Sequence, residues 1–278
     1  MIAASKYISC NIENLTQKAE DEFFSGIRLA NKTFKTTARV RMPDLDAIVA
    51  RLASEQGWTN PAVLDVGVSS GVTTADLLAT MLSKGLKPAV TATDLTMYAT
   101  ISSLGPGVRM LSDRTGNPLQ FEFFGFGIRA WTRRLDFVTG YFLLTGLARN
   151  LATTLSKTRL ADVALVSRLK VTSAENSIEF LEDDLATRNP DFDGQFDIVR
   201  AANLLNREYF EAAKLTTMIA NLKAYVRKPG GLMVVNRTGA DGTNHGTVFQ
   251  ASGSAMRVLQ RVGSGSEIES LFGPDNGH

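Results

Sequence analysis

Apolar residues recur along this chain in two patterns, one at helical spacing and one as short uninterrupted runs. Helical spacing covers 43–56 and 72–84, and a short apolar run at 62–66 separates the two stretches. A second apolar run, 89–93, ends on Asp94. Strand, helix and strand in this order are the unit of a parallel sheet with a right-handed crossover.

The same alternation returns in the second half of the chain. A helix is predicted over 207–227, with Asn206 as its cap. The further predicted strands, the last two of them antiparallel, cover 177–181, 195–200, 232–236, 247–250 and 256–262. Together with the two earlier runs they make seven strands. The sequence therefore predicts a doubly wound, mostly parallel seven-stranded α/β sheet of the Rossmann-like class.

Residues 98–170 interrupt this pattern, because they separate the second strand from the third by far more than one crossover helix needs. We expect them to form an inserted helical cap, rich in aromatic residues and arginine, that contributes to substrate binding. Residues 1–42 are expected to form an N-terminal helical segment. The α/β domain then consists of 43–97 and 171–278.

Composition and charge argue against several classes of function. The chain of 278 residues has 44% hydrophobic residues and a net charge of +2, so overall charge gives no reason to expect a nucleic-acid partner. Cys10 is the sole cysteine, and the histidines are His245 and His278, so no metal is expected. The N-terminus lacks the pattern of a secretory signal, and no apolar run is long enough to span a membrane. We expect a cytoplasmic protein.

A glycine-containing turn, Asp65 to Gly71, joins the first strand to its helix. Ligands of doubly wound sheets bind at such turns, where the helix offers free N–H groups. The dinucleotide motif G-x-G-x-x-G would require glycine at 67, 69 and 72, but Ser69 and Val72 occupy the second and third positions. The turn is therefore a poor match to a nicotinamide site.

The spacing Gly67-x-Ser69-x-Gly71 instead resembles the first motif of class I S-adenosylmethionine-dependent methyltransferases, usually D/E-x-G-x-G-x-G. Ser69 replaces the middle glycine, and chemotaxis-receptor methyltransferases also tolerate serine there. The resemblance extends to four later motifs in the family's order, over about half of the chain. These are Asp94 after the second strand, Asp184-Leu185 after the third, Phe196 to Leu204 along the fourth, and Lys228 to Leu232 before the fifth.

The resemblance implies S-adenosylmethionine as the methyl donor and a role for each matching residue. Asp94 would hold the ribose hydroxyls, Asp184 and the next backbone N–H would bind adenine, and the fourth motif would lie beside the methyl group. The implied donor-binding residues are Asp65, Gly67, Val68, Ser69, Gly71, Asp94, Leu95, Asp184, Leu185 and Ala202.

Four candidate site residues have a structural alternative. Asp94 can be an acid at the end of a strand without a ligand. Asp65 can orient the glycine turn rather than touch the ligand. Asp184 can cap a helix, in which case Asp183 would take its role in binding adenine. Asn203, a candidate catalytic residue, can instead stiffen a loop.

His245 is the second candidate for catalysis, since it is the sole internal histidine and lies in a polar loop, 239–246, after the fifth strand. It is a candidate general base or substrate contact. The alternative is an exposed loop histidine without a role.

The inserted region concentrates aromatic residues in 121–151, and 125–170 holds eight Lys or Arg but two acids, a local net charge of +6. Three interpretations stay open: a cap whose aromatics are packed, a lid for a bulky apolar or anionic small molecule, and a peripheral membrane surface that meets anionic lipid.

The preferred prediction is methyl transfer to a small or lipid-like acceptor, with oxygen slightly ahead of nitrogen. The alternatives are a protein carboxyl methyltransferase, suggested by the likeness of Val68-Ser69-Ser70-Gly71 alone, a non-catalytic donor-binding partner protein, and a nicotinamide oxidoreductase.

Overall fold

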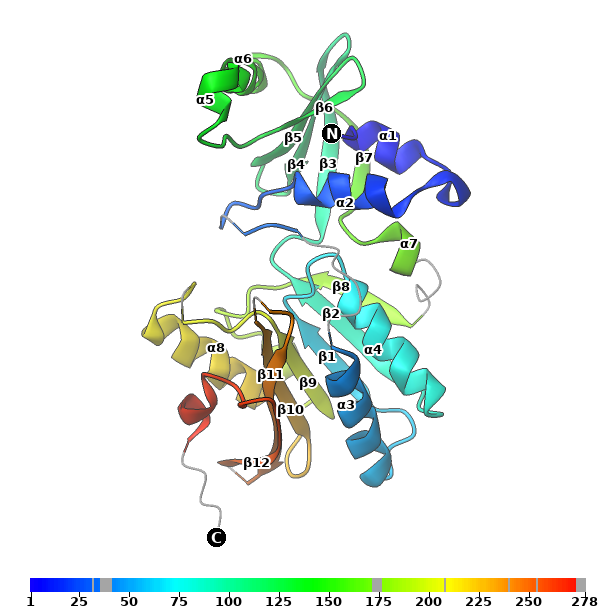
Figure 1. Cartoon of the computed structure of the whole chain (residues 1–278), viewed down its shortest axis with the longest axis vertical. Helices are drawn as coiled ribbons and strands as arrows, with labels where there is room; N and C mark the ends of the chain where they lie inside the picture. Colours follow the sequence, from blue (N-terminus) through cyan, green and yellow to red (C-terminus); the bar gives the residue numbers. More distant parts are fainter. Residues whose placement is uncertain are drawn as a thin grey trace. The chain divides into compact units, whose positions relative to one another are not determined.

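The computed structural model describes residues 1–31, 33–35, 42–171, 177–207, 209–239, 241–253 and 255–273, so His278 lies outside the described residues. Internal contacts divide the chain into two compact units, 1–37 with 96–172 and 38–95 with 173–278. Figure 1 labels the helices and strands of both, and each unit is described by itself.

The larger unit is built on a seven-stranded sheet with the strand order β8-β2-β1-β9-β10-β11-β12. The first five strands of this order are parallel to one another, and β11 and β12 are antiparallel to their neighbours. The strands are β1 (Ala62–Val66), β2 (Ala89–Asp94), β8 (Ile178–Glu182), β9 (Ile198–Ala202), β10 (Leu232–Thr238), β11 (Asn244–Ser252) and β12 (Ala255–Val262). The prediction of a mostly parallel seven-stranded sheet with two antiparallel closing strands is confirmed.

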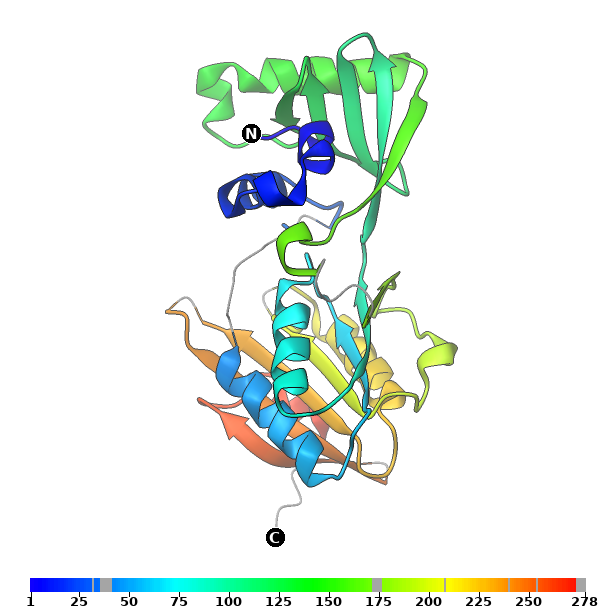
Figure 2. The ribbon, with the colours of Figure 1, turned by 90° about the vertical axis from the view of Figure 1, so that its right-hand side faces the viewer.

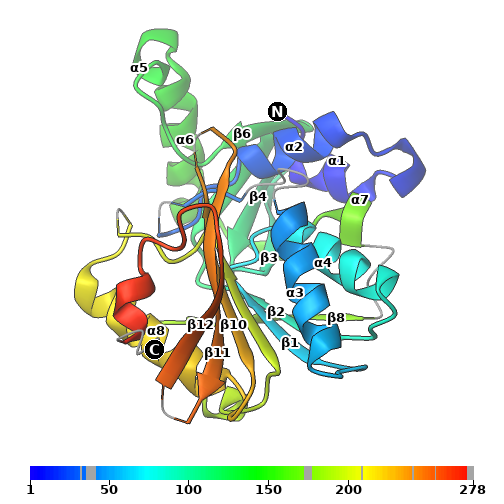
Figure 3. The same cartoon turned by 60° about the horizontal axis from the view of Figure 1, so that its bottom comes forward.

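Helices cover both faces of this sheet, as a doubly wound fold requires. Figure 3 shows α3 (Pro43–Glu55) and α4 (Val72–Ser83) on one face and α8 (Ala212–Tyr225) on the other. Short 3₁₀ turns lie at Pro190–Phe192 and Glu269–Phe272. Helix α8 begins after Glu211, so the prediction of Asn206 as its cap is wrong.

The residues between β9 and α8 explain that difference. The carbonyl of Asn206 accepts hydrogen bonds from the N–H groups of Tyr209 (3.2 Å) and Phe210 (3.1 Å), which makes a separate turn before the helix. Asn206 itself is buried. Asn206 therefore belongs to a turn, and helix α8 begins several residues after it.

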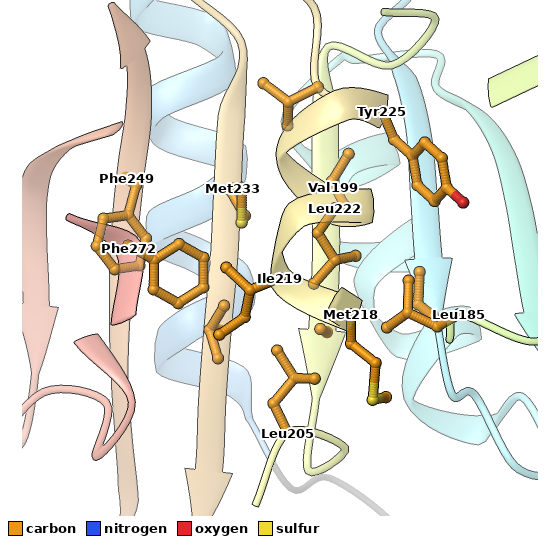
Figure 4. Packing of buried hydrophobic residues seen from close by; sticks show 14 of the residues in the cluster. Leu185, Val199, Leu205, Met218, Ile219, Leu222, Tyr225, Met233, Phe249 and Phe272 are labelled. Atoms are coloured by element: carbon orange, nitrogen blue, oxygen red, sulfur yellow. The ribbon is translucent and has the colours of Figure 1, made fainter. Parts of the chain in front are cut away.

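The core on the α8 face is made by side chains from this helix and the central strands. Figure 4 shows Met218, Ile219 and Leu222 of α8 directed at the strands, and all three are buried. At the far strands, the rings of Phe249 and Phe272 stack with centroids 4.5 Å apart. Burial of a side chain of this size stabilises the fold by about 1.5–3 kcal/mol, so this face anchors the carboxyl ends of β9 and β10.

The smaller unit contains a five-stranded antiparallel sheet with the order β6-β5-β4-β3-β7. Its strands are β3 (Tyr98–Gly105), β4 (Val108–Asp113), β5 (Pro118–Phe123), β6 (Phe126–Arg129) and β7 (Thr158–Ala164). The expectation of a helical cap is therefore wrong for this inserted region, which is built on a sheet that carries two helices between β6 and β7.

The aromatic run at the centre of the insertion is a β-hairpin. Phe121 and Phe123 alternate with polar residues along β5, and Phe123 pairs with Phe126 across the turn. The two turn residues, Phe124 and Gly125, have φ values of 46° and 82°, as a two-residue hairpin turn of type I′ requires. This period-two pattern was the available sequence signal for strands.

Helices pack on both faces of this second sheet. The N-terminal helices α1 (Ala4–Ser9) and α2 (Gln17–Ser25) bury Tyr7, Phe23 and Phe24 against one face. On the other face α6 (Tyr141–Thr154), preceded by α5 (Asp136–Thr139), contacts β4 and β5 through Ala148 and Ala152. Figure 2 shows α6 crossing the strands. The N-terminal helical segment thus belongs to the same compact unit as the insertion, and α7 (Arg168–Val171) ends it.

The side chains of β5 hold the first residues of the chain in place. The Ala4 N–H donates to Gln120 Oε1 (2.7 Å), and Gln120 Nε2 donates to the Ile2 carbonyl (3.0 Å). A Cβ at Gly127 would stand 2.7 Å from the Ile2 carbonyl oxygen, so glycine leaves room for the first residues of the chain. Among the described residues, none of the helices combines the length and apolar character needed to cross a membrane.

Candidate functional site

The carboxyl ends of β1 and β9 lie side by side, and the chain leaves them in opposite directions. From β1 it passes through α4 to β2, and from β9 it passes through α8 to β10 on the other side of the sheet. At such a reversal of strand order the connecting loops separate, and doubly wound sheets bind their ligands there. The glycine turn is the first of these two loops.

The backbone of the glycine turn has three residues in the left-handed region. They are Gly67 (φ 74°), Ser69 (φ 56°) and Gly71 (φ 75°). A Cβ at Gly67 would lie 3.0 Å from a methyl carbon of Leu204, so this position needs glycine for space as well as for conformation. Gly71 precedes the first turn of α4, and no side chain caps that helix.

The turn is attached to the end of the neighbouring strand β2. The N–H groups of Gly67 and Val68 both donate to the carbonyl oxygen of Thr93, at 2.7 and 3.1 Å. The Ser69 N–H donates to Asp94 Oδ2 at 2.7 Å. Asp94 is half-buried, and Leu95, the next residue, has 47% of its surface exposed. A carboxylate therefore stands at the edge of the sheet, joined to the centre of the turn.

Asp65 lies beneath the turn rather than at its surface, with 1% of its surface exposed. Its Oδ1 accepts from Arg200 Nε (3.0 Å), and its Oδ2 accepts from Arg200 Nη2 (2.5 Å) and Thr74 Oγ1 (2.7 Å). The bidentate ion pair fixes Asp65 between β9 and the start of α4. These contacts match the alternative that Asp65 orients the turn.

Sequence reasoning missed Arg200, which is fully buried in the middle of β9. Its Nη1 also donates to Asp46 Oδ1 (2.8 Å) on α3, and its Nη2 donates to the Thr73 carbonyl (2.9 Å). Burial, opposed by Arg200 and reinforced by the nearby Asp65, raises the pKa of Asp46 to about 6. An arginine inside an apolar strand was the sequence signal for a buried ion pair.

The end of β8 carries the candidate adenine-binding residues. Asp184 is exposed, and its Oδ1 accepts the Ala186 N–H at 3.0 Å, while Leu185 is buried in the α8 core. Asp183 is half-buried and accepts from Asn189 Nδ2 at 3.2 Å. Burial raises the pKa of Asp183, and the adjacent Asp184 adds to the effect. The Asp183 N–H also donates to the Asp94 carbonyl (3.1 Å), so both acids stand beside the end of β2.

Asn203 joins the ends of β9 and β10. It has a φ of 56°, and its N–H donates to the Asn236 carbonyl at 2.9 Å. Its Oδ1 accepts the Thr238 N–H (2.6 Å), and its Nδ2 donates to Thr238 Oγ1 (3.3 Å). Both polar ends of the side chain are thus used within the protein, which matches the alternative that Asn203 stiffens the loop. Ala202, the last residue of β9, is half-buried beside it.

His245 is in strand β11, where it pairs with Arg237 of β10, so the expectation of a loop position is wrong. Its Nδ1 accepts the Ser264 N–H at 3.0 Å, and this requires the ring proton of the neutral form to be on Nε2. Nε2 lies 3.0 Å from Thr243 Oγ1, which in turn donates to Asp241 (2.6 Å). Three strand spacings separate β11 from β1, about 14 Å at ~4.8 Å each. The structure does not bring His245 to the glycine turn.

Within the described part of the chain, no group of three or more His, Cys, Asp or Glu side chains is placed to hold a metal ion.

Comparisons with known proteins give no family assignment. None of the family models matches the chain, and no curated protein matches it. Several solved structures are similar to part of it, and the chain spans less than two thirds of each of the three described next.

One is a putative S-adenosylmethionine-dependent methyltransferase from Methanococcus maripaludis, at 12% identity over 69% of this chain and 54% of that one, with a TM-score of 0.32. Another is an N-methyltransferase from Bradyrhizobium japonicum in complex with S-adenosylhomocysteine, at 13% identity, 71% and 62% coverage and a TM-score of 0.33. A third is a putative zinc-dependent alcohol dehydrogenase from Rhodobacter sphaeroides, at 12% identity, 81% and 56% coverage and a TM-score of 0.35. Likenesses this slight carry no argument about function, so the function is inferred from the site.

Proposed function

We propose that this protein is an S-adenosylmethionine-dependent methyltransferase that acts on a small or lipid-like acceptor, with oxygen slightly favoured over nitrogen as the methylated atom. The observation that carries the proposal is the hydrogen bond from the Ser69 N–H to Asp94 Oδ2 (2.7 Å). It places a carboxylate and a strained glycine turn together at the reversal of strand order. A carboxylate has about four acceptor positions, which is more than the Ser69 N–H alone occupies.

The residues at this edge fit the parts of the donor. The uncapped N-terminus of α4 offers backbone N–H groups and a positive dipole end to a carboxylate such as that of methionine. Gly67, Val68, Ser69 and Gly71 shape the turn that leads into this helix, and their own N–H groups are bonded within the protein. Asp94 and Leu95 are then assigned to the ribose.

The remaining donor contacts come from the neighbouring strands. Asp184 and the Leu185 N–H are assigned to adenine, and Ala202 is assigned to the neighbourhood of the methyl group. Asp65 supports the turn from below through Arg200 and Thr74.

The donor supplies a methyl group that its sulfonium already activates. The task of the protein is to align the acceptor behind that methyl group and to exclude water. A hydroxyl acceptor must also lose its proton as the new bond forms. We assign that step neither to His245, whose Nδ1 is bound by the Ser264 N–H, nor to Asn203, whose amide is bound to Thr238.

One observation counts against one of the alternatives. At the third glycine position of the dinucleotide motif stands Val72, a buried residue in the first turn of α4, which disfavours the nicotinamide oxidoreductase. The protein carboxyl methyltransferase rests on residues 68–71 alone, and a non-catalytic donor-binding protein would have the same site.

Calorimetry with S-adenosylhomocysteine and with NADH tests the site. We expect binding of the first and none of the second. Asp94→Asn should weaken binding about 10–100-fold, because a charge-assisted acceptor is lost. The matched control is Asp44→Asn, an exposed acid in the first turn of α3, which should leave the affinity unchanged. Binding of NADH alone, or equal affinity of the two variants, would contradict the proposal.

A turnover assay distinguishes a methyltransferase from a protein that binds the donor without catalysis. Purified protein with radiolabelled methyl donor, incubated with hydroxyl- and amine-bearing small molecules and with lipid extract, should produce a labelled product. Tight binding of S-adenosylhomocysteine without label transfer to any acceptor class would favour the non-catalytic partner protein.

A further inference from the structure

The two helices that cross the second sheet leave most of their apolar side chains in solvent. Helix α6 buries just Thr145, Ala148 and Ala152. The exposed large apolar residues of α5, of its N-cap and of α6, which we call the apolar ridge, are Leu135, Phe137, Val138, Leu143, Leu144 and Leu147. Their exposed fractions run from 47% for Leu144 to 85% for Val138. A monomeric protein rarely leaves so many large apolar side chains exposed on one short segment.

The ridge is held in a defined shape by its own packing. Phe137 of α5 stacks on Phe142 of α6, with ring centroids 5.1 Å apart, and Tyr141 Oη accepts the Arg129 N–H at 2.7 Å. On α6, Leu143 and Leu147 are one helical turn apart and share the face turned away from Ala148. Among the described residues of the smaller unit, none covers this face of the helix.

The charges next to the ridge are of one sign. Between 131 and 157 the chain has four Lys or Arg and a single acid, Asp136. Asp136 is buried and pairs with Arg129 (2.9 Å), and its pKa is lowered, first by the Arg133 N–H and then by Arg129. Arg133 and Arg134 are exposed at the base of α5. The surface offers apolar side chains and cations together, with its one carboxylate turned inward.

Two kinds of occupant would cover an apolar helix face of this kind. A second copy of the chain would bring Arg133 and Arg134 of each copy toward the same positive surface, and like charges across an interface are unfavourable. An anionic lipid surface is complementary to both features, since acyl chains accept the apolar residues and headgroups neutralise the arginines.

We propose that the α5–α6 hairpin is a peripheral membrane-binding element for anionic lipid. Helix α6 has 14 residues, about 21 Å at 1.5 Å per residue, and would lie in the plane of the headgroups with Leu143 and Leu147 directed into the leaflet. Phe137 and Val138 would enter the leaflet beside these two leucines. This inference concerns a surface of the smaller unit and does not depend on the proposed methyl transfer.

Flotation of the full-length protein with lipid vesicles tests the inference. We expect association with phosphatidylcholine vesicles that contain phosphatidylserine at about a third of the lipid, little association with pure phosphatidylcholine, and loss of association at high salt. Leu143→Ser with Leu147→Ser should lower the partition coefficient by roughly tenfold or more. Arg133→Ser with Arg134→Ser should lower it by roughly tenfold and reduce its salt dependence.

The matched control is Leu82→Ser, an equally exposed leucine (49%) on helix α4 of the larger unit, which should float as the wild type does. Circular dichroism verifies that each variant is folded, and the arginine pair provides a test that leaves every apolar side chain in place. Equal flotation of the wild type, the leucine double variant and the arginine double variant would overturn the inference, and so would no flotation of the wild type. So would a dimer in sedimentation equilibrium that dissociates on Leu143→Ser with Leu147→Ser, because the ridge would then be a contact between copies.

Discussion

The two units of this protein differ in the side chains that stand out in each. The larger unit encloses an arginine and two carboxylates beneath its glycine turn, with Arg200 fully buried between Asp46 and Asp65. The smaller unit leaves leucine and phenylalanine in solvent on α5 and α6. Buried ion pairs constrain geometry, whereas exposed apolar faces serve contacts with other molecules. Under the two proposals above, the larger unit holds the candidate site in place and the smaller unit presents the lipid-binding surface.

The strongest expected effect comes from removal of the buried charge in the larger unit. Arg200→Met leaves Asp46 and Asp65 buried without their counter-charge, and should lower the free energy of unfolding by about 3–5 kcal/mol. Urea denaturation followed through Trp58, in a Trp131→Phe background, reports on this unit.

A triple variant distinguishes the effect of the lost ion pairs from the effect of altered packing around Arg200. In the triple variant Arg200→Met, Asp46→Asn, Asp65→Asn, no uncompensated charge remains, so most of the lost stability should return. A loss below about 1 kcal/mol in Arg200→Met alone would show that the network contributes little to stability.

A smaller effect is expected at the glycine turn. Gly67→Ala combines a left-handed backbone conformation with a Cβ 3.0 Å from Leu204, and should cost about 2–3 kcal/mol. Gly85→Ala is the matched control, since Gly85 has φ 80° but nothing within 4 Å of its Cβ, and it should cost about 1 kcal/mol. Thermal unfolding measures both, and equal losses would mean that the contact with Leu204 is easily relieved.

The next effect depends on pH. Burial raises the pKa of Asp46 to about 6, with Asp65 and Asp76 adding and Arg200 opposing. The folded protein then binds a proton near pH 5 that the unfolded chain, with a pKa near 4, does not bind. Stability from this group is therefore lost as pH rises from about 4 to above 6, by about 1.4 kcal/mol between pH 5 and 7.5.

Asp46→Asn removes this titration. The free energies of unfolding of wild type and variant, measured by urea at both pH values, should differ by that amount in their pH dependence. Parallel curves for the two proteins would show that Asp46 stays ionised across the range.

The smallest effect is expected on the apolar ridge. Leu147→Ser, at a position with 52% of its surface exposed, should change the free energy of unfolding by less than about 0.5 kcal/mol. Ala148→Ser, at the fully buried neighbouring residue, should cost more because it places a hydroxyl against the sheet. Urea denaturation followed through Trp131 reports both. A loss above 1 kcal/mol at Leu147 would mean that the ridge packs within the unit.

Local patterns were sufficient for most of the larger unit. Short apolar runs at 62–66 and 89–93, with helical spacing between them, predicted β1, α4 and β2 almost to the residue. The glycine spacing at 67–71 predicted a turn that leaves the backbone in unusual conformations, and the structure has positive φ at three of its positions. These features follow from neighbours in sequence, because strand burial, helix periodicity and glycine turns are set within a few residues.

The smaller unit shows where local patterns fail. The inserted region was expected to form a helical cap, but β5 and β6 have the alternation of a hairpin, and the Gln120 side chain of β5 binds the backbone of Ile2 and Ala4. A strand pairs with residues distant in sequence, so its partners cannot be found from spacing alone.

The sequence by itself determined the doubly wound sheet, its glycine turn and the acid at the end of β2, because each has its signal in residues adjacent along the chain. Tertiary structure alone decided that Asp65 faces Arg200, that His245 lies in a strand with its Nδ1 bound, and that leucines of α6 face solvent. The physical reason is distance along the chain. The orientation of a side chain depends on the groups that pack against it, and Arg200, the partner of Asp65, lies 135 residues away along the chain.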